Sequence, residues 1–336
     1  MHLGKSYTFS EFVFWSRRKL YALLPCGALP IILYQFLGMK WLSIPLSIVV
    51  LLGTATSFIV GFKNVQTYNR AAEAQQIWTN ILNGSRFLGI ISRDFPAERA
   101  AGRELILRHC AWLTALRYQL RAPRIWESMG KSSNAEYQKK HYRVPEWETP
   151  LEQALARYLT ETEIKLIMQV ENKATRILAS QSAVIKRYRE SGEIDETAYM
   201  EFVRSIKGFF EHQGQAERIK EYPYPRQYAV INKLFVRSFC VLLPFGILTE
   251  FVKIKDNISG LMHDGVIWLV VPFSAMISWM YLVLEQVGES TENPFEGNAN
   301  DVPIAQVCRK IERELMDILG ETSQVAETES KDCIVL

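Results

Sequence analysis

The sequence lacks the patterns that mark most enzymes and metal proteins. It contains no CxxC pair, because its five cysteines are isolated from one another: Cys26, Cys110, Cys240, Cys308 and Cys333. Neither a zinc site nor a disulfide framework is therefore expected. It also contains no glycine-rich phosphate loop, no GxSxG elbow and no HExxH motif. We expect no catalytic residues, no metal and no cofactor, and hence a protein that is not an enzyme.

The chain also lacks a strong charge of either sign. Its 39 Lys and Arg residues nearly balance its 36 Asp and Glu residues, which leaves a formal charge of +3. That charge, without a ladder of aromatic and basic residues, does not indicate nucleic-acid binding. A cleavable signal peptide is not expected either, because the apolar run after Arg17-Arg18-Lys19 has no convincing small-residue cleavage site.

What the sequence does have is an uncharged run from Trp41 to Phe62, flanked by Lys40 and Lys63. A bilayer core of ~30 Å needs roughly 20 apolar residues of helix, so this run is long enough to cross it. Two stripes run along it at four-residue spacing, which places each stripe on one helical face. The small stripe is Gly53, Ser57 and Gly61, and the bulky stripe is Thr54, Phe58 and Phe62.

The two stripes have two interpretations. Small residues let a neighbouring helix approach closely in lipid. In a symmetric ring of helices packed through the small stripe, the bulky stripe would face a shared axis and form a hydrophobic constriction, as in some channel gates. Alternatively, both stripes serve ordinary helix packing. Periodicity alone does not separate the two.

Three further apolar runs make four predicted membrane helices, two near each end of the chain. The first is opened by the basic cluster Arg17-Arg18-Lys19 and is expected to be kinked by Pro25 and Pro30. This cluster places the N-terminus in the cytoplasm by the positive-inside rule, and four crossings return the C-terminus there. The four helices are Leu20–Met39, Trp41–Phe62, Tyr228–Val252 and Gly265–Leu284.

The remaining chain reads as helical and polar, with no strand pattern. After Phe62 the helical periodicity continues without an obvious break. Amphipathic helices are predicted at 97–121, 151–190, 196–221 and 304–319, with a loop at 129–150. We therefore expect an all-α integral membrane protein with these segments: 1–62, an interfacial stretch and two membrane helices; 63–227, a cytoplasmic helical domain; 228–287, two membrane helices; 288–320, a cytoplasmic segment; and 321–336, a disordered tail.

Four local patterns follow one another in a particular order. They are Gly61-Phe62-Lys63 with Tyr68-Asn69-Arg70 and Glu73-Ala74; the helix from His109 to Arg121; Glu217-Arg218-Ile219 with Pro223 and Pro225; and the segment from Glu292 to Ile304. Together with the membrane topology, these residues resemble the bestrophins, specifically their bacterial branch. The resemblance extends over about residues 20–319. Ala71 and Ala72 depart from it, because they stand where the family pattern has paired tryptophans.

The resemblance implies a homopentameric ion channel in a lipid bilayer. The family's neck residues would fall on Thr54, Phe58 and Phe62, the bulky stripe already found by spacing, with the small stripe holding the ring closed. A second, cytoplasmic constriction would lie near Thr197, with Ile194 one turn earlier. Monovalent anions such as chloride are the first choice of permeant ion, because the edges of Phe rings carry partial positive charge.

Two other functions stay open at this point. Aromatic faces favour cations, so a sodium-selective channel of the same architecture is one alternative. A non-conducting membrane scaffold, with the helical domain docking a soluble partner, is the other. The bacterial character of the motifs suggests the inner membrane.

Two features of the C-terminal part concern calcium binding and prenylation. Eukaryotic bestrophins carry a dense acidic run that binds calcium after the last membrane helix, whereas the acidic residues here are dispersed, so no calcium site is predicted. The last four residues, Cys333 to Leu336, fit a C-a-a-X prenylation pattern. The bacterial character of the other motifs favours chance as its origin.

Overall fold

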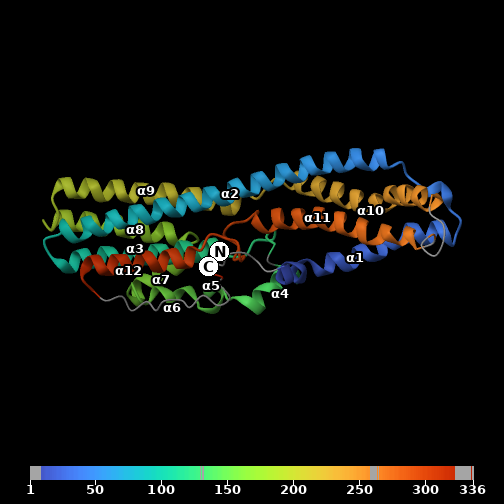
Figure 1. The fold of residues 1–336 in the computed structure, drawn as a ribbon. Coiled ribbons are helices and arrows are strands. Elements are labelled where there is room, and N and C mark those ends of the chain that lie inside the picture. The colour runs from blue at the N-terminus through green and yellow to red at the C-terminus, as the bar shows by residue number, and fades with distance from the viewer. Residues whose placement is uncertain are drawn as a thin grey trace. The chain divides into compact units, whose positions relative to one another are not determined.

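The computed structural model describes residues 9–128, 130, 132–257, 263, 265–321 and 334. All the elements over these residues are helices, so the expected all-α fold is confirmed (Figure 1). The chain forms two compact units. One contains the described residues within 5–69 and 223–292, and the other contains those within 70–222 and 293–336.

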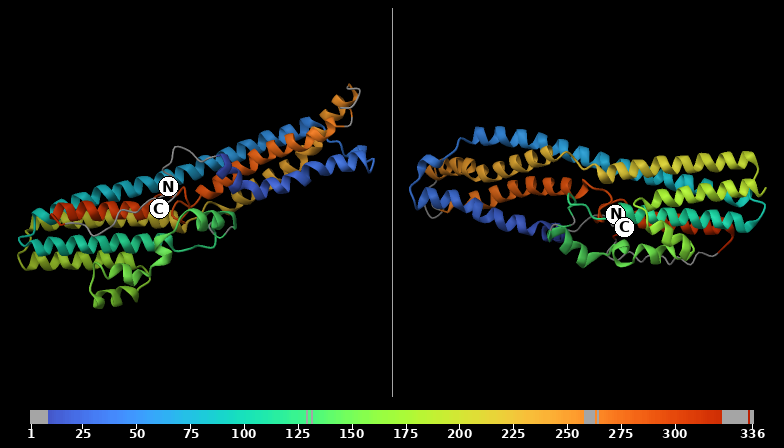
Figure 2. Two further views of the ribbon diagram at one scale, coloured as in Figure 1. Left: turned by 60° about the horizontal axis from the view of Figure 1, so that its bottom comes forward. Right: turned by 180° about the vertical axis from the view of Figure 1, so that it is seen from behind.

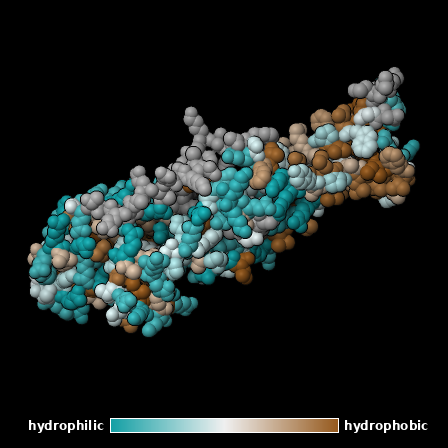
Figure 3. Space-filling model, turned by 90° about the horizontal axis from the view of Figure 1, so that it is seen from below, coloured by the Kyte–Doolittle hydropathy of each residue, from teal (hydrophilic) through white to brown (hydrophobic). Residues whose placement is uncertain are grey.

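The first unit, the membrane unit, is built from long apolar helices. Its elements are α1 (Phe9–Gln35), η1 (Lys40–Leu42), the first part of α2 (Leu46–Asp94), α10 (Arg226–Asp256), η2 (Val266–Leu269) and α11 (Val270–Thr291). Helices α1, α10 and α11 pack against one another (Figure 2). The core of this unit contains Val49 and Val60 of α2 together with Phe239 and Leu243 of α10. Apolar residues also gather on the surface of this unit, whereas the other unit is mostly polar (Figure 3).

Three helical segments among the described residues are long and apolar enough to cross a membrane: Lys40–Asp94, Arg226–Asp256 and Val266–Thr291. They correspond to three of the four runs expected from the sequence. The remaining run forms most of α1, a 27-residue helix with Pro25 and Pro30 inside it. Because α1 is not among the three, a fourth crossing stays a prediction.

Helix α2 continues without interruption from the membrane unit into the other unit, as its periodicity predicts. It has 49 residues, whereas about 20 residues of helix suffice to cross a bilayer core. At ~1.5 Å per residue the helix is much longer than the bilayer is thick. Its second part is therefore available to build the core of the polar unit.

The second unit, the polar unit, is a helical bundle around α3. Its helices, besides the second part of α2, are α3 (Arg99–Arg121), α4 (Ser132–His141), α5 (Pro145–Glu148), α6 (Leu151–Leu155), α7 (Glu161–Met168), α8 (Lys173–Glu190), α9 (Glu196–Glu221) and α12 (Ile304–Leu319). Helix α3 packs against α8, α9 and α12. Its Leu105, Trp112 and Leu116 are fully or almost fully buried. This core positions the loops described below.

Two sequence predictions for this unit are wrong in detail. The stretch 129–150, expected to be a loop, contains the short helices α4 and α5. The single helix expected over 151–190 is three helices, because two side chains cap new helix starts within it. Thr160 and Glu163 form a capping box at α7, and the side chain of Asn172 accepts a hydrogen bond from the Thr175 N–H at α8.

The C-terminal residues are described only in part. Ile334 is the one described residue within 322–336, and its side chain is buried with Tyr142, Val144 and Ala299. The rest of the prenylation pattern, Cys333 included, lies outside the described residues.

Candidate functional site

The bulky stripe of α2 lies on a face that the other described residues leave largely uncovered. Thr54, Phe58 and Phe62 are all exposed, with 71% of Phe58 and 69% of Phe62 accessible. Leu51 and Val65 extend the same exposed face in both directions. Phenylalanines this accessible on a membrane helix contribute little to packing among the described residues of their own chain. They are available to lipid or to another copy.

The small stripe is divided between two environments. A Cβ added to Gly53 would lie 2.7 Å from Cε2 of Phe239 on α10. Ser57 Oγ lies 2.6 Å from the hydroxyl oxygen of Tyr281 on α11, and it also donates to the Gly53 carbonyl. A Cβ added to Gly61 would meet no described atom within 4 Å outside the backbone of its own helix. Gly53 therefore packs within its own chain, Ser57 bonds to Tyr281 but stays exposed, and Gly61 has open space for close approach of a neighbour.

A set of ion pairs ties the membrane helices together where the apolar runs end. Lys63, only 2% exposed, has its Nζ 3.8 Å from an oxygen of Glu292. Further pairs link other elements of this unit: Lys19 with Glu285 at 3.5 Å, Lys233 with Glu289 at 2.8 Å and Arg226 with Glu292 at 4.0 Å. Two of the four pairs, Lys19–Glu285 and Lys233–Glu289, join α1 and α10 to α11. The other two join Lys63 of α2 and Arg226 of α10 to Glu292, the residue directly after α11.

The two residues expected at a cytoplasmic constriction have different surroundings. Thr197 lies exposed in the first turn of α9. Ile194 precedes that helix and is only 3% exposed, because its side chain is part of the polar unit's own hydrophobic core. In this structure Ile194 is therefore not available to line a passage, and of the two expected residues only Thr197 faces outward.

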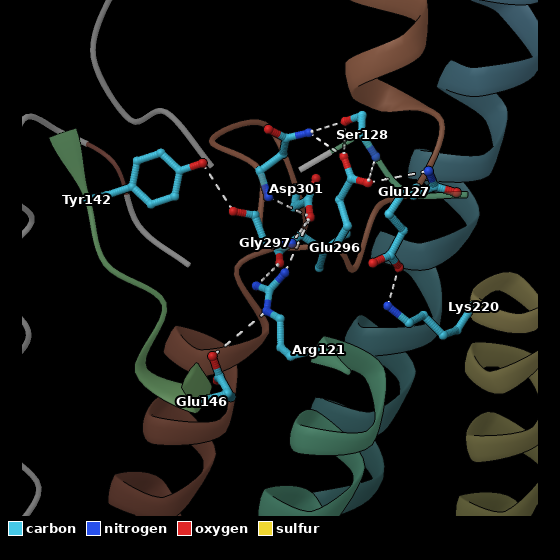
Figure 4. Close-up of polar contacts among 12 residues, drawn as sticks. Arg121, Glu127, Ser128, Tyr142, Glu146, Lys220, Glu296, Gly297 and Asp301 are labelled. Atoms are coloured by element: carbon cyan, nitrogen blue, oxygen red, sulfur yellow. Dashed lines mark hydrogen bonds and ion pairs between the residues drawn. The ribbon is translucent and has the colours of Figure 1, made fainter. Parts of the chain in front are cut away.

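The segment between α11 and α12 holds a buried polar network (Figure 4). The Asp301 carboxylate accepts hydrogen bonds from the backbone N–H groups of Gly297 at 2.7 Å and Asn298 at 3.0 Å. It also accepts one from Arg121 Nη1 at 3.3 Å. Arg121 Nε lies 3.9 Å from Glu146. The network joins the C-terminal end of α3 to a loop about 180 residues later in the chain.

Glu296 is the second carboxylate of this network, and it is fully buried. It accepts hydrogen bonds from the Ser128 N–H at 2.7 Å, from the Ser128 hydroxyl and from the Asn298 amide. Burial raises the pKa of Glu296 to about 8, and the nearby Asp301 carboxylate contributes to this rise. Burial also raises the pKa of Asp301, to about 6, although Arg121 opposes that shift.

The oxygens of these two carboxylates are engaged by donors from the protein itself. Among the described residues no group of three or more His, Cys, Asp and Glu side chains could hold a metal ion. Two of the sequence motifs contain this segment and the helix that ends at Arg121, but they do not predict the contact between them, because the two are far apart in the chain. Ser128 belongs to none of the motifs, and only its polarity could have indicated a role.

An all-helical fold, three segments able to cross a membrane and an exposed aromatic stripe on one of them define a helical integral membrane protein. The model of the bacterial and fungal bestrophin family matches residues 17–317. The chain belongs to this family. Its resemblance to the bestrophins, inferred from four short motifs, is thereby confirmed.

Relatives of known name and structure agree with this membership. The chain is 25% identical over 290 residues to the voltage-dependent anion channel-forming protein YneE of Salmonella typhi, covering 86% of this chain and 80% of the relative. It is 24% identical over 276 residues to the similarly named protein RSc3414 of Ralstonia nicotianae, covering 81% and 77%. A crystal structure of a bacterial bestrophin homolog from Klebsiella pneumoniae superposes with a TM-score of 0.74 at 26% identity, covering 90% of this chain and 98% of that one. The protein is accordingly an ion channel of bestrophin type and not an enzyme.

Proposed function

We propose that the protein is a homopentameric channel that conducts monovalent anions such as chloride through a neck lined by α2. The observation that carries this proposal is the exposure of Phe58 and Phe62 on an uncharged membrane helix. The names of the YneE relatives support an anion as the permeant species. Thr54 would form the outer ring of the neck, and Phe58 and Phe62 its hydrophobic rings.

Ring geometry gives a physical reason for anion passage. A ring of phenylalanines offers no hydrogen bond to a dehydrating ion, so such a neck is a barrier that small changes in diameter open or close. The edge of an aromatic ring carries partial positive charge and its face partial negative charge. Rings that present their edges to the axis therefore favour anions, and rings that present their faces favour cations.

The exposed positions also suggest how copies meet. Gly61 is the member of the small stripe with open space around it, so we assign the close contact between neighbouring copies of α2 to Gly61. Gly53 and Ser57 instead hold α2 to α10 and α11 of the same chain. Thr197 is assigned to a wider inner aperture.

We further propose that both termini lie in the cytoplasm and that the channel resides in a bacterial inner membrane. The basic cluster Arg17-Arg18-Lys19 near the start of α1 supports this orientation by the positive-inside rule. It requires α1 to cross the membrane, giving four crossings. Labelling of single cysteines placed at Met39 and at Asn257 by an impermeant reagent tests it, since both positions would be reached only from outside.

The decisive experiment measures ion flux through the purified protein in liposomes. Wild type is expected to dissipate a chloride gradient, with a reversal potential in asymmetric KCl that has the sign of an anion conductance. The opposite sign would show a cation channel, and no flux would favour a non-conducting scaffold. Either result overturns the proposal.

A pair of variants tests the neck. Phe58→Ala is expected to raise the conductance, because it removes a ring from the narrowest part. Phe273→Ala is the matched control, since Phe273 is also an exposed aromatic in the membrane unit but lies on α11. An unchanged current in Phe58→Ala, or an equal rise in Phe273→Ala, would remove the neck assignment.

A further inference from the structure

Helices α2, α10 and α11 of the membrane unit meet around Phe239. A Cβ added to Gly53 of α2 would lie 2.7 Å from this ring, and the Tyr281 ring of α11 lies against it with centroids 4.5 Å apart. Further along α10, a Cβ added to Gly246 would lie 2.8 Å from Val49 Cγ2. Contacts later on α10 thus fall earlier on α2, so these two helices run in opposite directions (Figure 1).

This register places Asn232 of α10 beside the part of α2 that leads to Lys63. Seven residues make nearly two full turns of helix, so residues seven apart share a face. Asn232 precedes Phe239 by seven residues, and Val60 follows Gly53 by seven. Both are buried, with 1% of Asn232 and 2% of Val60 exposed. Asn232 therefore faces α2 at about the level of Val60, within one turn of Lys63.

Helix α11 reaches the same level at Gly288, which follows Tyr281 by seven residues. A Cβ added to Gly288 would lie 2.2 Å from Asn64 Oδ1 and 3.7 Å from Lys63 Cε. The Lys63 Nζ atom lies 3.8 Å from an oxygen of Glu292, which makes an ion pair but is longer than a hydrogen bond. The three helices thus bring an ammonium group, two side-chain amides and a carboxylate to one junction.

Several polar atoms at this junction are buried without a hydrogen-bond partner among the residues that the structure describes. They are Lys63 Nζ, Asn64 Oδ1 and both amide atoms of Asn232, Nδ2 and Oδ1. Burying such atoms unmatched costs free energy. The chain itself already encloses them, since only 2% of Lys63 and 1% of Asn232 are exposed. Only a very small molecule can therefore reach them.

We propose that Lys63, Asn64 and Asn232 form a binding site for internal water. The unmatched atoms include both N–H donors and amide oxygens. Chloride would match only the donors, whereas a metal cation would match only the oxygens and would be repelled by Lys63. Water both donates and accepts, and a buried water typically makes about three hydrogen bonds to groups of this kind.

The bound water has a definite task at this place in the chain. It supplies hydrogen-bond acceptors to the Lys63 ammonium, which directly follows Phe62 and sits among apolar helices. The charge of Lys63 can then stay buried at the end of the uncharged run. The proposal does not depend on which ion the channel conducts.

The direct test is an experimental structure of the full-length protein at a resolution that shows ordered water. At least one water is expected within about 2.7–3.2 Å of Lys63 Nζ or of an amide atom of Asn232. A junction without such density overturns the proposal. A second data set, collected with bromide in place of chloride, identifies an anion: an anomalous peak at the junction would also overturn it.

Substitutions of Asn232 test the site in solution by the sign of the change in Tm. At a dry junction Asn232→Leu removes an unmatched amide and raises the Tm. At a hydrated junction it removes partners of the water and leaves Lys63 less well hydrated, so the Tm is expected to fall by about 2 °C or more. Asn232→Ser keeps a donor and an acceptor and is expected to lower the Tm less. Gln227→Leu, which replaces an exposed amide in the first turn of the same helix, is the matched control and should leave the Tm unchanged.

The Tm is measured in potassium chloride and in potassium gluconate at equal ionic strength, and wild type is expected to give the same value in both. A higher Tm in chloride that Asn232→Leu abolishes would show a bound anion and refute the water site. A rise in Tm for Asn232→Leu, or a fall no larger than that of Gln227→Leu, would refute it as well. Should Asn232→Leu fail to fold, the density at the junction of wild type decides alone.

Discussion

Two glycines on the same face of α2 allow a direct test of how its small stripe is used. Gly53→Ala adds a methyl group 2.7 Å, 3.3 Å and 3.5 Å from three atoms of the Phe239 ring. That ring cannot easily move aside, because Phe239 is buried and packs against Tyr281 with ring centroids 4.5 Å apart. Overpacking of this kind costs about 1–3 kcal/mol.

Gly61→Ala is the matched substitution and has the opposite expectation. The added methyl group meets no described atom within 4 Å outside the backbone of its own helix. Replacing glycine by alanine inside a helix gains up to about 1 kcal/mol. The gain applies to Gly53 as well and offsets part of its cost. The two variants should therefore differ in unfolding free energy by about 1–3 kcal/mol, with Gly53→Ala the less stable.

The assay is thermal unfolding of the purified variants in one detergent, with oligomer mass measured in parallel by light scattering. Gly53→Ala is expected to lower the Tm, and Gly61→Ala to leave the fold of the chain intact. If Gly61 is the contact between copies, Gly61→Leu should reduce the oligomer mass although it spares the chain's own packing. Equal Tm values for Gly53→Ala and Gly61→Ala would refute the division of the stripe.

Two further predictions concern buried charges. Since the pKa of Glu296 is raised from its ordinary value of 4.5 to about 8, the folded state binds a proton that the unfolded state releases, and stability should fall as pH rises between those values. Glu296→Gln should flatten the fall in Tm over this window, and an unchanged pH profile would contradict the assignment. Glu292→Gln leaves Lys63 buried without its carboxylate and should cost about 3–5 kcal/mol in chemical unfolding. Glu250→Gln is the control for Glu292→Gln. It breaks the exposed ion pair with Lys253 and should lower the unfolding free energy by about 1 kcal/mol or less.

Local periodicity was enough to predict the helical class and the long uninterrupted α2. Uncharged length identifies a membrane segment without knowledge of its neighbours, and the 3.6-residue repeat places Thr54, Phe58 and Phe62 on one face. The capping box at Thr160 and the cap at Asn172 are local features too, and they divide the stretch 151–190 into three helices. These features depend on residues within a few positions of one another.

Only the tertiary structure decided what each face meets. Gly53 and Gly61 are both glycines of one stripe, yet Gly53 lies against Phe239 and Gly61 has open space beside it among the described residues. The sequence places Ile194 and Thr197 near the same expected cytoplasmic constriction, but the side chain of Ile194 is buried in the hydrophobic core. A contact across nearly two hundred residues, such as the one between Arg121 and Asp301, depends on how helices pack and leaves no mark in local periodicity. Periodicity fixes the direction of a side chain on its helix, whereas the partner in that direction is set by the packing of the whole chain.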